Sequence, residues 1–156
     1  MFEVIICIVV FVILFIITLY IFFGSSKTNV INTSTQSSTK VQTQIKAKIL
    51  SLIKSELEII LEKDDIKKEF TIQESDEDSS YTVDSTINLV LSDTHDRIYP
   101  LDSIRHVAIH ELVHVVYPNS QDHDSSFYMI YDKFQKLATS YTKYKIPSNI
   151  DLYPCH

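Results

Sequence analysis

The stretch HELVH, from His110 to His114, lies inside the apolar run IRHVAIHELVHVV that extends from Ile104 to Val116. Apolar residues occupy every face of this run, which indicates a helix buried at the centre of a domain. The four-residue spacing puts the two imidazoles one helical turn apart on one face, where they can share a metal ion. Glu111 lies about 100° further round the helix, too far to join them easily as a ligand but close enough to touch a water at the metal. The pattern therefore predicts a zinc site with Glu111 as the general base.

The third ligand of this site is expected after the helix. A core helix with two hydrogen-bonded histidines is the alternative, but burying these groups without partners is costly, and one divalent cation satisfies them all. A catalytic zinc has three protein ligands and an open fourth position. His123 follows His114 after a loop that Pro118 interrupts, and we expect it to complete the site. The adjacent Asp122 and Asp124 are alternative ligands, although Asp124 is better placed to cap the next helix.

Composition excludes several other functions. The chain of 156 residues has a formal net charge of −6, so we expect no nucleic-acid partner bound by bulk charge. Its single glycine, Gly24, excludes a P-loop, a dinucleotide-binding fingerprint and a nucleophile elbow. Its two cysteines exclude a disulfide framework.

The N-terminal part is expected to attach the protein to a membrane. Residues 2–23 are almost entirely apolar and contain one charge, at Glu3, which predicts a transmembrane helix in preference to a cleaved signal peptide. Residues 24–40 are rich in Ser and Thr and predict a flexible linker. Lys27 and Lys40 predict a single-pass protein with its C-terminal domain in the cytosol. A glycosylation sequon at Asn32 is the argument for the opposite orientation.

Residues 41–156 are expected to form one α+β domain. Apolar spacing predicts an amphipathic helix over 41–63, and the segments 69–74 and 81–91 read as strands of a hairpin or a small sheet. A second helix runs from Asp102, its expected N-cap, to Tyr117, and a third begins after Asp124.

The motif resembles that of a known family. HELVH, followed by HDSSFY from His123 to Tyr128, is similar to the HELxH…HDxxFY signature of WLM-domain metallopeptidases and to the HExxH…HGxxF of the related SprT-like proteases. The resemblance covers residues 81–138. It implies a minimal zincin, with a small sheet packed on an HExxH active-site helix and flanking helices, and with the substrate extended along a sheet edge. It also implies that His110, His114 and His123 bind zinc and that Glu111 is the general base.

The chain departs from this family in two respects. The interval between His114 and His123 is longer than the usual WLM loop and lacks its glycine. The DNA-binding or SUMO-binding regions of the family are absent, so its DNA-crosslinked substrates are not carried over. Short anchored relatives of this kind resemble proteins encoded by large DNA viruses, so a viral source is expected.

The sequence thus predicts a membrane-anchored zinc metallopeptidase that hydrolyses peptide bonds in a protein or peptide substrate. Tyr128, Tyr141 and Tyr144 are candidates for stabilising the oxyanion. The alternative is a membrane-tethered interaction or peptide-binding protein with a structural zinc site, an inactive zincin. The presence of Glu111 favours the enzyme, because a purely structural site does not need a carboxylate at that position.

Overall fold

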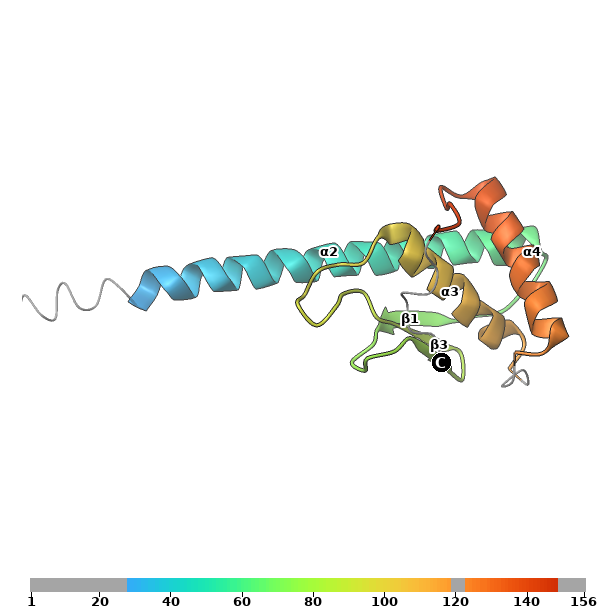
Figure 1. The fold of residues 1–156 in the computed structure, drawn as a ribbon, viewed down its shortest axis with the longest axis horizontal. Helices are drawn as coiled ribbons and strands as arrows, with labels where there is room; N and C mark the ends of the chain where they lie inside the picture. Colours follow the sequence, from blue (N-terminus) through green and yellow to red (C-terminus); the bar gives the residue numbers. More distant parts are fainter. Residues whose placement is uncertain (1–27, 119–122, 149–156) are drawn as a thin grey trace, which may run out of the picture. The chain divides into compact units, whose positions relative to one another are not determined.

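The computed structural model describes residues 28–118 and 123–148 (Figure 1). The chain divides into two compact units, Met1–Gln44 and Ile45–His156. The described elements are α2 (Thr28–Lys63), β1 (Thr71–Glu74), β2 (Tyr81–Val83), β3 (Thr86–Leu89), α3 (Leu101–Val116) and α4 (Ser125–Tyr141). The described part is therefore a small α+β protein with three helices and a three-stranded sheet, as the sequence predicted.

The sheet has the strand order β1-β3-β2, so β2 lies at one edge. β1 runs parallel to β3, and β2 pairs antiparallel to β3 with Thr82 opposite Ile87. The region 81–91, expected to be one strand, is divided by a tight turn between Val83 and Thr86. Asp84 in this turn has a φ of 55°, a left-handed conformation that Asp tolerates better than most residues because its short side chain can hydrogen-bond locally.

Helix α3 is buried at the centre of the second unit. It packs against β2, β3 and α4 (Figure 1). Leu112, Val113 and Val115 on this helix are fully buried, and the part of α2 that belongs to the second unit contributes the buried residues Ile53 and Leu57 to the same core. The prediction of a central helix that is apolar on all sides is confirmed.

A buried ion pair joins α3 to α2. Arg105 donates to both carboxylate oxygens of Glu56, at 2.7 Å from Nε and 2.5 Å from Nη2, and to Oδ1 of Asp102 at 2.9 Å. The prediction that Asp102 caps α3 is wrong: the N-cap is Pro100, and Asp102 lies in the first turn. Asp102 is drawn to Arg105 because the two residues lie three positions apart on the same helix face.

Helix α2 begins earlier than the sequence predicted. Residues 28–40, expected to belong to a flexible linker, continue the helix. No glycine or proline occurs between Thr28 and Lys63, and a helix that is already nucleated gains one hydrogen bond for each residue added. The remainder of the expected linker, residues 24–27, lies outside the described residues.

The expected membrane localisation is corrected. Across 28–118 and 123–148, no helix combines the length and the apolar character needed to cross a membrane. The single-pass assignment, with its cytosolic domain, therefore does not stand. The segment 2–23, from which it was inferred, lies outside the described residues.

Candidate metal centre

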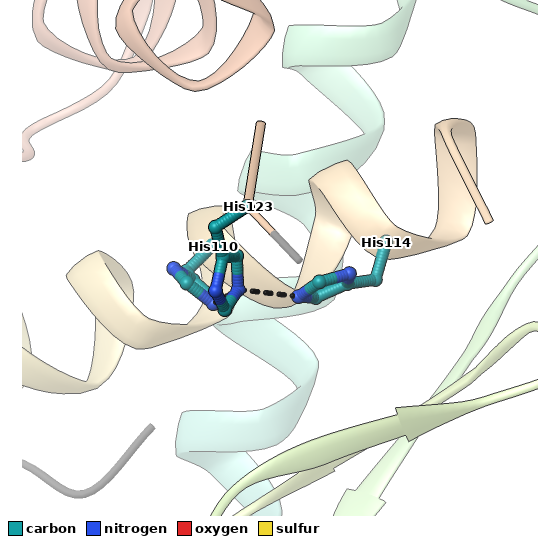
Figure 2. A group of neighbouring side chains, drawn as sticks. All are labelled: His110, His114 and His123. Atoms are coloured by element: carbon teal, nitrogen blue, oxygen red, sulfur yellow. Dashed lines mark hydrogen bonds between the residues drawn. The ribbon is translucent and has the colours of Figure 1, made fainter. Parts of the chain in front are cut away.

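Three histidines meet at the C-terminal half of α3. His110 and His114 lie on consecutive turns of this helix, and His123 approaches from the residues that precede α4 (Figure 2). Nε2 of His123 lies 3.0 Å from Nε2 of His110 and 3.1 Å from Nε2 of His114. All three side chains are half-buried, and one ring nitrogen from each lies within 4.8 Å of the others. The structure thus brings together the three residues that the sequence singled out.

The backbone around His123 directs its imidazole into this cluster. Its φ is 46°, in the left-handed region that costs a non-glycine residue roughly 1–2 kcal/mol. The next residue, Asp124, is the N-cap of α4, and its Oδ1 accepts a hydrogen bond from the backbone N–H of Phe127 at 2.9 Å. The predicted cap is confirmed, and this carboxylate is used on the helix. Asp122, the other alternative ligand, lies outside the described residues.

Phe127 forms an apolar wall against all three imidazoles. Its ring centroid lies 4.9 Å from those of His110 and His114 and 4.5 Å from that of His123. The side chain has no exposed surface. Such a wall limits solvent access and the local dielectric around a metal site. The sequence motif alone does not reveal this contact, because apolar spacing identifies core positions but not the polar groups that a core residue touches.

The two histidines on α3 are held in the neutral state that binds metals. Burial, together with the smaller effects of the neighbouring His114, His123 and His106, lowers the pKa of His110 to about 3. Burial, followed by the proximity of His123, also lowers the pKa of His114. Both imidazoles are therefore neutral at physiological pH, and a neutral imidazole nitrogen is a metal ligand.

The geometry of the cluster fits a small divalent cation. A neutral imidazole Nε2 either donates one hydrogen or accepts one, so hydrogen bonds satisfy the three converging nitrogens poorly. One cation accepts a lone pair from each of them. Tetrahedral zinc with Zn–N bonds of about 2.0–2.1 Å places its ligand nitrogens about 3.3 Å apart, close to the separations found here.

Glu111 lies on α3 between the two histidines and has no exposed surface. Its Oε2 accepts a hydrogen bond from Oγ1 of Thr82 at 2.8 Å, and its buried Oε1 has no hydrogen-bond partner among the described residues. Burial raises the pKa of this carboxyl to about 7, and the hydrogen bond from Thr82 opposes the increase. A carboxyl with a pKa near neutrality and one uncommitted oxygen can exchange a proton with a reacting group.

A second hydrogen-bonded group surrounds His106, one turn before His110. Its Nδ1 lies 2.9 Å from the hydroxyl of Tyr144, and its Nε2 lies 2.8 Å from the hydroxyl of Tyr131. The ring of Tyr131 in turn meets that of His110 edge-on, with centroids 5.7 Å apart. His106 is therefore outside the convergent cluster and is linked to it through Tyr131.

The three tyrosines proposed for the oxyanion lie in different environments. Tyr144 is buried against His106, and Tyr141 is exposed with Lys63 over its ring. Tyr128 is exposed, and its ring centroid lies 6.5 Å from that of His123. Of the three, Tyr128 is the one next to the cluster.

Comparison with known proteins identifies the family of this region. The family model of the WLM domain matches residues 82–148, which include β3, α3 and α4. The match confirms the resemblance that the motif indicated, and WLM domains are associated with zincin-like metallopeptidases and with zinc. No curated protein and no solved structure matches the chain. No comparison supports the expected viral source.

Proposed function

We propose that the protein is a zinc-dependent metallopeptidase of the minimal zincin type, in which His110, His114 and His123 hold the metal and Glu111 is the general base. The observation that carries this proposal is the convergence of three Nε2 atoms, with separations of 3.0 and 3.1 Å, beside a buried carboxylate that has one uncommitted oxygen. A purely structural zinc site requires the histidines but not Glu111, whose burial is costly.

Each residue of the site has a role in peptide hydrolysis. A zinc ion held by the three imidazoles would supply a Lewis acid that polarises the peptide carbonyl and makes water a stronger nucleophile. Glu111 takes a proton from the attacking water and returns it to the amine that leaves. Phe127 keeps the imidazoles in an apolar environment, where electrostatic interactions are stronger than in water.

The substrate of such a site is a protein or peptide in an extended conformation. β2 is an edge strand, and its Thr82 contacts Glu111 on the helix that carries two of the proposed ligands. A peptide added to this edge would bind through backbone hydrogen bonds, with its scissile bond close to α3. We therefore propose β2 as the strand on which the substrate lies.

The test is cleavage of a peptide library by the zinc-loaded full chain and by the Glu111→Gln variant. We expect cleavage by the wild type and a loss of several orders of magnitude in kcat for the variant, with the zinc retained, because the base is lost and the ligands are not. Equal cleavage by the two proteins would end the peptidase proposal. A wild type that binds zinc but cleaves nothing would favour the inactive zincin instead.

A further inference from the structure

A hydrogen bond connects the edge strand β2 to the carboxylate of Glu111. Oγ1 of Thr82 donates to Oε2 at 2.8 Å and lies 3.1 Å from the backbone oxygen of the same glutamate. The two residues are 29 positions apart, so the contact exists only when the strand packs on α3. Because the glutamate has no exposed surface, bulk water cannot replace this donor.

The contact makes the two oxygens of Glu111 unequal. Oε2 is held by Thr82, whereas Oε1 is buried with no hydrogen-bond partner among the described residues. The terminal torsion of a glutamate is broad, so a carboxylate without a fixed partner samples many orientations. A general base must keep one oxygen within hydrogen-bond reach of the proton that it removes.

We propose that Thr82 is a positioning residue for peptide hydrolysis: its hydroxyl holds Oε2 of Glu111 so that Oε1 takes the proton from water and returns it to the leaving amine. This inference rests on the proposed function and deepens it. On this proposal β2 has two roles: the substrate lies along the strand, and Thr82 on the same strand orients the base.

Activity measurements separate this role from a merely structural one. Thr82→Val removes the hydroxyl at nearly constant volume, and Thr82→Ser restores it. We expect Thr82→Val to lower kcat about 10- to 100-fold, the usual effect of removing a group that orients an active-site residue, with KM and zinc content unchanged. Thr82→Ser should recover most of the loss.

Thr71→Val is the matched control, because Thr71 is also a strand threonine and its hydroxyl lies 2.8 Å from that of Thr86 on β3. We expect this variant to keep the wild-type kcat. A Thr82→Val protein that cleaves as fast as the wild type would overturn the positioning role and leave the peptidase proposal intact. A wild type that cleaves no peptide would instead end the proposed function.

A second measurement does not depend on activity. Thr82→Val, Glu111→Met and the double variant form a double-mutant cycle, and urea unfolding of the metal-free full chains measures the coupling between the two side chains. A hydrogen bond to a buried carboxylate predicts a coupling of about tenfold in the unfolding equilibrium constant. A coupling factor near one would mean that the hydroxyl does not hold the carboxylate, and the inference would fall whatever the chain cleaves.

Discussion

The Nε2 atoms of His110 and His123 lie 3.0 Å apart, although 13 positions separate the two residues. His110 is fixed by α3, which is buried in the core, whereas His123 depends on the short segment that leads into α4. Asp124, the next residue, caps that helix. The position of the third imidazole is therefore tied to the start of α4.

The cap at Asp124 predicts a moderate effect on stability. Asp124→Ala leaves the backbone N–H of Phe127 without the acceptor that it has at 2.9 Å, so we expect the free energy of unfolding to fall by about 1 kcal/mol. Urea unfolding checks this value, and Asp124→Asn, which keeps a capping oxygen, should lose much less. Unchanged stability in Asp124→Ala would mean that the cap contributes nothing.

His106 is predicted to stabilise the fold through Tyr144. His106→Leu removes the nitrogen that lies 2.9 Å from the hydroxyl of this tyrosine, which is only 3% exposed. A buried hydroxyl that loses its partner costs about 1–3 kcal/mol, so the melting temperature should fall. In the double variant His106→Leu/Tyr144→Phe the hydroxyl is absent, and part of the loss should be recovered. If the melting temperature of the double variant does not recover, the loss in His106→Leu does not come from the unpaired hydroxyl of Tyr144.

The pKa of Glu111 predicts how the metal-free chain responds to pH. Burial raises this pKa from its ordinary value of 4.5 to about 7 in the folded chain, so the folded state binds the proton more tightly than the unfolded state. The stabilising contribution is complete below pH 4.5 and is lost as the pH rises through 7, an effect of roughly 3 kcal/mol.

We therefore expect the free energy of unfolding of the wild type, measured with a chelator present, to fall between pH 4.5 and 7 relative to that of Glu111→Gln. The two proteins differ only at position 111, so the difference between them isolates the contribution of this side chain. If the free energies of unfolding of the wild type and Glu111→Gln change in parallel with pH over this range, the pKa of Glu111 is not raised.

The sequence alone predicted helix α3 and the meeting of the three histidines, because both depend on residues that are close together in the chain. Four-residue spacing on a helix fixes the relative direction of His110 and His114, and His123 follows soon afterwards in the chain. The α+β class was predictable for the same reason, since each helix has its own apolar spacing.

Long-range contacts were not predictable in this way. Thr82 contacts Glu111 only because β2 folds back antiparallel on β3, and the turn that makes this possible contains Asp84 rather than the Asn-Gly or Asp-Gly pairs that signal hairpins. Tyr131 reaches His106 from another helix, a contact between helices that apolar spacing along the chain does not reveal. The helical residues 28–40 were not predicted, because a high content of Ser and Thr indicates disorder. Composition does not show that a helix formed by the residues that follow can extend into such a segment.

The most direct test of the metal centre is the zinc affinity of the full chain, measured by competition with a chromophoric chelator, for the wild type, His123→Ala and Asp124→Ala. We predict one zinc per wild-type chain, an affinity lower by orders of magnitude in His123→Ala, and an affinity near that of the wild type in Asp124→Ala, whose carboxylate caps α4. A wild type that binds no zinc, or a His123→Ala variant that binds it as tightly as the wild type, would contradict the three-histidine site.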